Sequence, residues 1–243
     1  GKITSVPYIK MTLLLLDQLG VETSFEGQVI QVKPYLDTVS KTFTVESDWS
    51  SASYFYSIVA LSSVGTQINL NTYKKDSLQG DAVLQEIYAH LGVQTTFKGS
   101  KINLKKINSD LPKSLDLDLA NAPDIAQTIV VTCLGLQIKC NLTGLHTLKI
   151  KETDRLEALK NEIYKFGTAI DITDDSLHLN NYKPLKSGAE IETYNDHRMA
   201  MAFAPLALKT SFSIKEAEVV SKSFPDFWDN LVELGFNTFE SEK

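Results

Sequence analysis

Four stretches of the chain carry apolar residues three and four positions apart, and each stretch ends at a glycine. This spacing predicts amphipathic helices, because it places the apolar side chains on one face, and glycine is common just past a helix end. The terminating glycines are 72, 75 and 68 residues apart, so the pattern indicates an internal repeat. The four stretches are Leu13–Gly20, Val83–Gly92, Leu159–Gly167 and Phe227–Gly235.

Short alternating stretches follow the first three of these helices. Apolar and polar residues alternate on both sides of a central pair of turn-forming residues, which predicts β-hairpins. The hairpins span Val21–Val32, Val93–Leu104 and Ala169–Leu179, with turns at Glu26-Gly27, Lys98-Gly99 and Asp174-Asp175.

A second set of helices alternates with the first, and each begins just after an aspartate. These aspartates, Asp48, Asp124 and Asp196, are 76 and 72 residues apart, which matches the period of the glycines. The predicted helices are Ser50–Ser62, Ile125–Leu134 and Arg198–Leu208, and the strand-like runs after them are Gln67–Leu70, Ile138–Leu142 and Phe212–Ile214.

The combined pattern predicts an α/β (α+β) fold whose units have the order strand, helix, strand, helix, strand, strand. The helices are so apolar, above all in Ile125–Leu136, that several must be buried on more than one side. We therefore expect the units to pack around a common axis, with the helices inside and the sheets outside.

The repeat also predicts a domain boundary. Residues 1–45 contain only the second half of a unit, namely a helix, a hairpin and a strand at Lys41–Glu46, with a loop at Pro34–Ser40. Complete units begin near Asp48, and the chain opens without methionine, directly in a helix-like segment. We expect residues 1–45 to be the last partial unit of an otherwise missing domain, and residues 46–243 to form a second domain.

Composition narrows the range of functions. The chain has 243 residues, 43% of them hydrophobic and 22% charged, as in an ordinary soluble globular protein, and its net charge of −6 argues against nucleic-acid binding. Cys133 and Cys140 lie in apolar runs, which predicts buried, reduced thiols in a cytoplasmic protein. The apolar runs are too short to cross a membrane. Four scattered histidines argue against a zinc site, and a glycine-rich phosphate loop is lacking.

Cations at predicted helix starts are the most informative chemical feature. Lys151 and Arg155 flank a start at which Asp154 and Glu157 fit a capping box. A helix N-terminus already carries partial positive charge, so cations there are locally unfavourable, and their presence indicates a site for an anion such as phosphate or carboxylate. A solvated charge cluster is the alternative.

Two further helix starts show the same feature. Arg198 opens one predicted helix, and Lys222 precedes another, for which Ser223 is a plausible cap and Pro225 suits the first turn. If the units surround one axis, these starts point to a shared site for a substrate with several negative charges. The alternative, that each cation pairs with a neighbouring acid such as Glu152, loses weight because three repeat-related starts share the feature.

Two carboxylates stand among these cations. Asp124, at the start of an apolar helix, is a candidate for chemistry because of the neighbouring cations, with an N-cap as the structural alternative. Glu152 either caps, forms a salt bridge or moves a proton, and a carboxylate surrounded by cations stays ionised, so it can act as a base or relay. His197, beside Arg198, is a candidate for orienting such a carboxylate, with a satisfied polar histidine as the alternative.

Six segments carry a combination of residues typical of one enzyme family. They are Asp48–Tyr54, Ser77–Asp81, Ala122–Asp124, Lys151–Arg155, Tyr194–Met201 and Ser223–Phe227. Together they resemble the signature segments of the 3-phosphoshikimate 1-carboxyvinyltransferase (EPSP synthase) family. The resemblance runs from about Ser5 to the C-terminus, roughly the C-terminal half to three-fifths of the family's length. It implies two domains, each of three βαβαββ units in pseudo-threefold arrangement, the inside-out barrel of enolpyruvyl transferases.

The resemblance also implies a reaction. The enolpyruvyl group of phosphoenolpyruvate is transferred to the 5-hydroxyl of shikimate 3-phosphate, with release of phosphate, in the shikimate pathway of aromatic amino acid biosynthesis. Addition and elimination proceed through a tetrahedral intermediate without metal or organic cofactor. The implied enzyme is cytoplasmic and monomeric at full length, and its partners are the two small-molecule substrates, with no nucleic acid and no membrane.

Motif matches then assign roles to individual residues. The implied catalytic residues are Asp124 as base toward the 5-hydroxyl, Glu152 in proton transfer at the phosphoenolpyruvate methylene, and Lys222 as a proton donor. The implied phosphoenolpyruvate ligands are Arg155, Arg198 and Lys222. The implied shikimate 3-phosphate ligands are Ser5, Tyr8, Asp124 and Lys151, and His197 has a supporting role.

The chain departs from the family in two respects. Thr147 stands where some members carry a substrate-binding Asn. The family's N-terminal Lys-Ser and Arg ligands, its central Gly and its Ser-Ser-Gln segment are absent, so we expect negligible turnover from this chain alone. Two alternatives stay open: a UDP-N-acetylglucosamine enolpyruvyl transferase, which shares the fold and repeat, and a non-catalytic anion-binding domain that uses the same helix termini.

Overall fold

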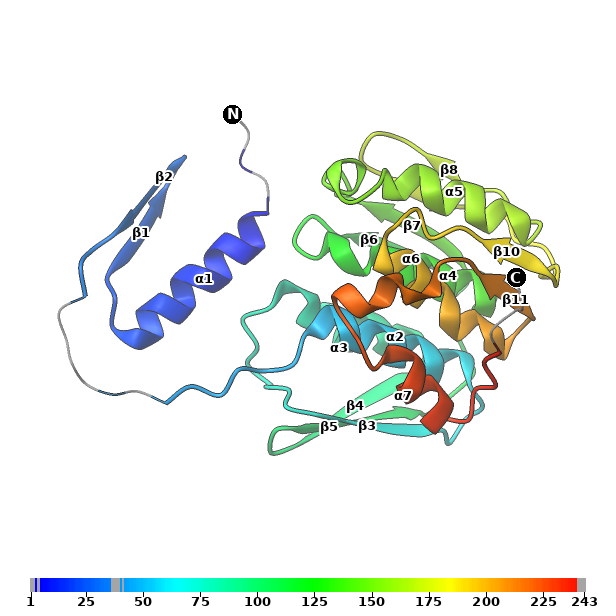
Figure 1. The fold of residues 1–243 in the computed structure, drawn as a ribbon, viewed down its shortest axis with the longest axis horizontal. Coiled ribbons are helices and arrows are strands. Elements are labelled where there is room, and N and C mark those ends of the chain that lie inside the picture. The colour runs from blue at the N-terminus through cyan, green and yellow to red at the C-terminus, as the bar shows by residue number, and fades with distance from the viewer. Residues whose placement is uncertain (1–2, 4, 36–39, 41, 240–243) are drawn as a thin grey trace.

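The N-terminal part of the chain forms one helix and one hairpin. The computed structural model describes residues 3, 5–35, 40 and 42–239. Helix α1 (Val6–Leu19) is followed by β1 (Thr23–Glu26) and β2 (Val29–Val32), which pair antiparallel as predicted. Figure 1 shows these three elements at one side of the rest of the molecule. None of the fourteen residues of α1, all of them described, is buried.

Helix α1 begins at Val6, earlier than the predicted start at Leu13. Ser5 precedes it in a left-handed conformation with φ 57°, and Pro7 stands in the first turn, where its missing N–H removes no helical hydrogen bond.

The first repeat contains two helices and a three-stranded sheet. Asp48 begins the first of these helices, because its carboxylate accepts the backbone N–H groups of Ser50 and Ser51. The strands are antiparallel in the order β3-β5-β4, so the predicted hairpin is confirmed. The elements are α2 (Trp49–Leu61), β3 (Gln67–Asn71), α3 (Leu84–His90), β4 (Val93–Lys98) and β5 (Lys101–Lys106).

The second repeat is a complete βαβαββ unit. Its sheet has the order β6-β7-β9-β8, in which β6 and β7 are parallel and the other pairs are antiparallel. Strands β7, β9 and β8 thus repeat the arrangement of β3, β5 and β4. The elements are β6 (Ser114–Asp118), α4 (Ala126–Leu136), β7 (Lys139–Thr143), α5 (Arg155–Lys165), β8 (Asp171–Ile172) and β9 (Leu177–Leu179).

The third repeat follows the same order as far as its second helix. Strands β10 and β11 are parallel, as are β6 and β7 in the second repeat. The elements are β10 (Ala189–Ile191), α6 (His197–Phe203), the 3₁₀ turn Ala204–Leu208, β11 (Phe212–Ile214), the 3₁₀ turn Ala217–Lys222 and α7 (Phe227–Glu233). The expected order is complete in the second repeat, while the described part of the first repeat lacks the opening strand and the third follows the order as far as its second helix.

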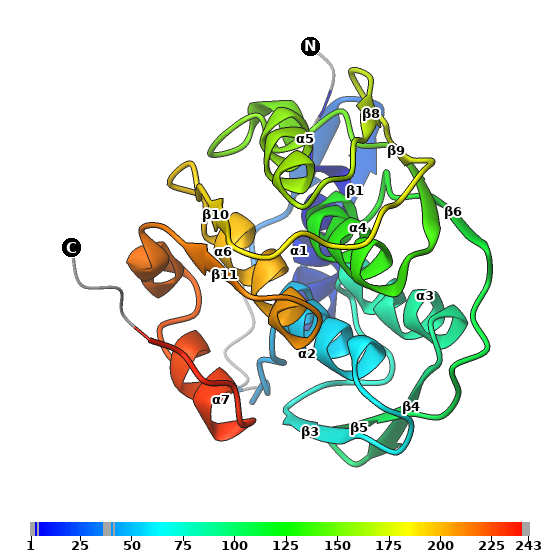
Figure 2. The ribbon, with the colours of Figure 1, turned by 90° about the vertical axis from the view of Figure 1, so that its right-hand side faces the viewer.

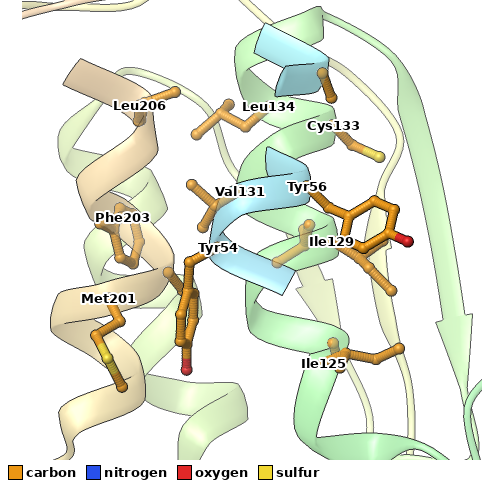
Figure 3. Packing of buried hydrophobic residues seen from close by; sticks show 14 of the residues in the cluster. Tyr54, Tyr56, Ile125, Ile129, Val131, Cys133, Leu134, Met201, Phe203 and Leu206 are labelled. Atoms are coloured by element: carbon orange, nitrogen blue, oxygen red, sulfur yellow. The ribbon is translucent and has the colours of Figure 1, made fainter. Parts of the chain in front are cut away.

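The helices α2, α4 and α6 lie at the centre, and the sheets lie around them (Figure 2). Twelve of the thirteen residues of α2 and nine of the eleven of α4 are buried, as expected for helices covered on more than one side. Figure 3 shows Leu134 of α4 and Leu206, from the turn after α6, pointing toward one another. Cys133 and Cys140 are buried free thiols, as predicted.

Two pairs of hydroxyl groups join α2 to α4 inside this core. Ser53 Oγ lies 3.0 Å from Thr128 Oγ1, and Thr132 Oγ1 donates to Ser57 Oγ across 2.7 Å. Both pairs are separated by 75 residues in sequence, which is one repeat. Because buried hydroxyls are costly without partners, the equivalent helices of two repeats satisfy each other.

Two local predictions are wrong. The strand expected at Lys41–Glu46 is not a strand over the described residues 42–46, and Lys41 lies outside the described residues, as do four residues of the loop expected at Pro34–Ser40. Ser223 does not cap α7, which begins at Phe227 with Asp226 at its N-cap and no side-chain cap, because the 3₁₀ turn before it ends at Lys222. In the described part of the chain, no helix is long and apolar enough to cross a membrane.

Candidate active site

The helices α4, α5 and α6 begin close together, and one arginine joins their starts. Arg155, the first residue of α5, is only 1% exposed. Its Nε donates to Asp196 Oδ2 across 2.7 Å, its Nη2 to Glu152 Oε2 across 2.7 Å and to Asp196 Oδ1 across 3.4 Å, and its Nη1 to Asp124 Oδ1 across 3.1 Å. Two of the three cation-bearing starts that were predicted to meet, those of α5 and α6, thus lie together with the start of α4, and Arg155 binds three carboxylates there.

Asp124 lies at the centre of this arrangement and is 7% exposed. Its Oδ1 is 3.2 Å from Lys151 Nζ, and its Oδ2 is 3.5 Å from Arg198 Nη2. The Tyr8 hydroxyl, 116 residues away in sequence, donates to Oδ2 across 2.6 Å. Three cations and a phenol thus converge on one carboxylate.

The interpretation of Asp124 as an N-cap is wrong. The chain enters α4 through the 3₁₀ turn Pro123–Ile125, whose N-cap is Ala122, and neither the turn nor α4 has a side-chain cap. Asp124 therefore lies inside the first turn, where its carboxylate faces the cations.

The charge of Asp124 follows from these contacts. Burial raises its pKa, but Arg198, the Tyr8 hydroxyl, Lys151 and Arg155 together outweigh burial and lower the pKa to about 2. Asp124 is therefore ionised at neutral pH. Anything that removes the cations from it would raise its pKa and make it a better proton acceptor.

Asp196 and Asp154 both cap helices, but only one of them also binds a cation of the network. Asp196 is 0% exposed, and its carboxylate accepts the backbone N–H of Arg198 across 2.8 Å. The other side-chain hydrogen bonds of Asp196 are donated by the Arg155 guanidinium. Asp154 accepts the backbone N–H groups of Leu156 and Glu157 at the start of α5. The predicted helix start at Asp154 is confirmed.

A cavity of about 220 Å³ is lined by Tyr8 and Lys151, both of which contact Asp124. It lies between the start of α1 and the loops that precede α4 and α5. Thr147 is one of the residues that line it, and its Oγ1 is buried without a hydrogen-bond partner among the described residues. The polar residues that line the cavity are Ser5, Tyr8, Asn121, His146, Thr147 and Lys151. The candidate residues Ser5, Tyr8 and Lys151 are thus brought together around one space.

Three other candidate residues lie around this centre. Lys222 is exposed, and its Nζ donates to Asn195 Oδ1 across 2.8 Å and to the Asn195 carbonyl across 3.3 Å, just before α6. The side chain of Glu152 is 42% exposed while it binds Arg155. His197 Nδ1 is buried and has no hydrogen-bond partner in the described part of the chain, and burial, with Arg198, lowers the pKa of its imidazole.

Sequence reasoning missed the acid Asp81, which is 6% exposed. A Cβ on the preceding Gly80 would lie 2.3 Å from the Asn121 carbonyl oxygen, so only glycine permits the close approach that brings Asp81 to the start of α4. Burial raises the pKa of Asp81 to about 7, Arg198 opposes this rise, and Asp124 adds to it. In the sequence, the segment Ser77–Asp81 stands out only as a family signature, because no cation near Asp81 in the chain indicates that its carboxylate belongs to the site.

Solved structures define the class of fold. An EPSP synthase of Acinetobacter baumannii superposes with a TM-score of 0.76 at 23% identity, covering 99% of this chain and 56% of that one. The enolpyruvyl transferase NikO of Streptomyces tendae superposes with a TM-score of 0.63 at 13% identity, covering 95% and 54%. The pseudo-threefold arrangement of βαβαββ units, with helices inside and sheets outside, is therefore the fold of the enolpyruvyl transferases.

Sequence comparison then gives the family. Residues 1–231 match the model of the family EPSP synthase (3-phosphoshikimate 1-carboxyvinyltransferase). A 3-phosphoshikimate 1-carboxyvinyltransferase of Bacteroides fragilis is 45% identical over 240 residues, which are 97% of this chain and 58% of that relative. The chain belongs to the EPSP synthase family, and it spans somewhat more than half the length of the curated relatives it matches.

Proposed function

We propose that this chain supplies part of the active site for the transfer of the enolpyruvyl group of phosphoenolpyruvate to the 5-hydroxyl of shikimate 3-phosphate. The observation that carries the proposal is the ionised Asp124, held by Lys151, Arg155, Arg198 and Tyr8, two of which, Lys151 and Tyr8, also line a cavity. Both substrates are multiply charged anions, and a buried cluster of cations suits them. The family supports the same reaction.

Asp124 is the proposed base toward the 5-hydroxyl. A carboxylate with a pKa of about 2 is a weak base, but its pKa is held down by cations that anionic substrates would also bind. As phosphate and carboxylate groups engage Lys151 and Arg198, Asp124 loses part of its stabilisation and becomes more basic. Substrate binding would thus prepare the group that accepts the hydroxyl proton.

The shikimate 3-phosphate side is assigned to the 220 Å³ cavity. Lys151 supplies a cation for the phosphate, and Ser5 and Tyr8 supply hydroxyl groups at the start of α1. Thr147, which stands at the place of an Asn in some family members, is among the residues that line the same cavity, and its hydroxyl oxygen is buried without a partner among the described residues.

The phosphoenolpyruvate side is assigned to the cations on α5, on α6 and before α7. Arg198 and Lys222 are its proposed main ligands, and Lys222 is the proposed proton donor. Arg155 is the third ligand in this proposal, with four of its hydrogen bonds already made to carboxylates. Glu152, partly exposed beside Arg155, is proposed to move the proton at the methylene carbon.

We propose that residues 1–45 and 46–243 belong to two domains, and that this chain alone has negligible turnover. The lack of any buried residue in α1, all of which is described, supports the boundary, and the fact that the chain spans only 58% of a relative's length supports the low turnover.

We also propose that the enzyme is cytoplasmic, because its two thiols are free, and that it is monomeric at full length. Light scattering of the complete polypeptide tests the last point.

Phosphate release with both substrates tests the proposed function. It is measured on the 243-residue chain and on the complete polypeptide encoded by the reading frame in which this sequence occurs. We expect turnover only in the complete polypeptide, a fall in kcat of about 10²-fold or more for Asp124→Asn, and an unchanged rate for the exposed control Asp229→Asn. Release of phosphate with UDP-N-acetylglucosamine in place of shikimate 3-phosphate would contradict the assignment.

A further inference from the structure

The loop before α6 adopts an unusual backbone conformation. Tyr194 and Asn195 are consecutive residues with φ of 54° and 56°, in the left-handed region that bulky side chains rarely adopt. Strained backbone of this kind persists only when surrounding contacts hold it in place. In this loop, those contacts come from Glu162 and Lys222.

Glu162 lies on α5 and is 0% exposed. Its Oε1 accepts the Tyr194 hydroxyl across 2.8 Å, and its Oε2 accepts the Glu192 backbone N–H across 3.0 Å and lies 2.7 Å from Lys165 Nζ. A fully buried carboxylate is costly unless its oxygens are satisfied, and here both oxygens are used to hold the strand-to-helix loop.

The held loop carries two residues, Asn195 and Asp196, that contact cationic residues of the candidate site. Asn195 binds the Lys222 ammonium through its carbonyl and side-chain oxygens. Asp196 binds Arg155 and caps α6 at the Arg198 N–H. The position of the loop therefore sets the positions of three cations at once.

We propose that Glu162 is a positioning residue for the phosphoenolpyruvate side of the site, acting through Tyr194 and the left-handed turn at Tyr194 and Asn195. This inference rests on the proposed function for its substrate and on the contacts above for its geometry. The role concerns only one half of the site. In the described part of the chain, the contacts of Tyr8 and Lys151 and the lining of the cavity include no residue of this loop.

Tyr194→Phe removes only the hydroxyl, and Glu162→Gln keeps the shape of the side chain. In the complete polypeptide, we expect each variant to raise the KM for phosphoenolpyruvate about tenfold and to leave the KM for shikimate 3-phosphate within about twofold. Tyr164→Phe, on the same helix and 70% exposed, is the matched control and should change neither constant. Equal changes in both constants with a lowered Tm, or no change in either, would overturn the proposal.

A second measurement does not depend on turnover. His197 follows the loop directly, and burial and Arg198 hold its imidazole pKa below the ordinary 6.5. In NMR titrations of this chain, Tyr194→Phe should move the His197 pKa toward 6.5, while Tyr164→Phe should not. If the unsubstituted enzyme has no activity but the His197 titration moves, the proposed function fails and the positioning role stands. If activity is present and neither the KM nor the titration responds, the positioning role fails.

Discussion

The Nε of Arg155 donates to Oδ2 of Asp196 across 2.7 Å, and both side chains are buried. The pair joins the first residue of α5 to the residue that caps α6, 41 positions later. An ion pair in this place fixes the relative position of two helix starts from neighbouring repeats.

Breaking this pair should be costly. Asp196→Asn leaves the buried guanidinium of Arg155 without one of its carboxylates, and loss of one partner of a buried pair typically destabilises a protein by about 3 to 5 kcal/mol. We expect a loss of that order in the free energy of unfolding, measured by urea titration at pH 7. Asp226→Asn, at a helix start without a side-chain cap, is the control and should change little. A loss for Asp196→Asn no larger than the control's would show that the pair is not structural.

Asp124 should make the fold sensitive to acid. Its pKa is about 2 in the folded chain, below the ordinary 3.8, so its ionised form stabilises the fold above pH 4 and this stabilisation disappears as the pH falls toward 2. The amount is about 2 kcal/mol, since one pKa unit corresponds to about 1.4 kcal/mol. Urea titrations between pH 2 and pH 5 should show a smaller loss for Asp124→Asn than for the parent chain, and parallel curves would contradict this.

Asp81 should have the opposite effect. Its folded pKa is about 7, above the ordinary 3.8, so the neutral acid is favoured in the folded state. Stability contributed by this group is complete below pH 4 and is lost as the pH rises through 7. Asp81→Asn, which mimics the neutral acid, should therefore raise the Tm relative to the parent at pH 8 and leave it nearly unchanged at pH 4. Asp229→Asn, which alters an exposed acid on α7, is expected to show no such difference.

The cap of the first central helix is open to a direct test. Asp48 accepts the backbone N–H groups of Ser50 and Ser51 as well as their hydroxyls. Asp48→Ala should lower the free energy of unfolding by about 1 to 2 kcal/mol, the usual value of an N-cap. Asp226→Ala removes an aspartate from the same position of α7, where it makes no cap, and should cost less than half as much in the same chemical denaturation experiment.

The helix starts at Asp48, Asp154 and Asp196 were predictable, because a cap acts on backbone groups two or three residues away. The repeat was predictable for the same reason, since each unit repeats its local signals. The strand expected near Glu46 failed because that segment docks through a side chain, with Ser77 and Trp49 donating to the Glu46 carboxylate, instead of forming a ladder.

The site was only partly predictable. The sequence indicated the cations and Asp124 as site residues. It also allowed Asp124 to be the N-cap of the helix, because a 3₁₀ turn before a helix has no clear sequence signal. The contact between Tyr8 and Asp124 spans 116 residues, and no local rule relates such positions. Burial of Asp81 depends likewise on the close approach of Gly80 to Asn121, which is a property of the folded chain.

The hydroxyl pairs between α2 and α4 help to fix the register of the two helices relative to one another. Sliding one helix past the other by a single turn would re-form at most one of the two pairs, Ser57 with Thr128 or Ser53 with Thr132, and would leave the other two hydroxyls without cross-helix partners in an apolar interior. Apolar contacts alone tolerate such a slide more easily, because they are not directional. The alignment that satisfies all four hydroxyls is therefore favoured over one shifted by a turn, and the two repeats set each other's helix register.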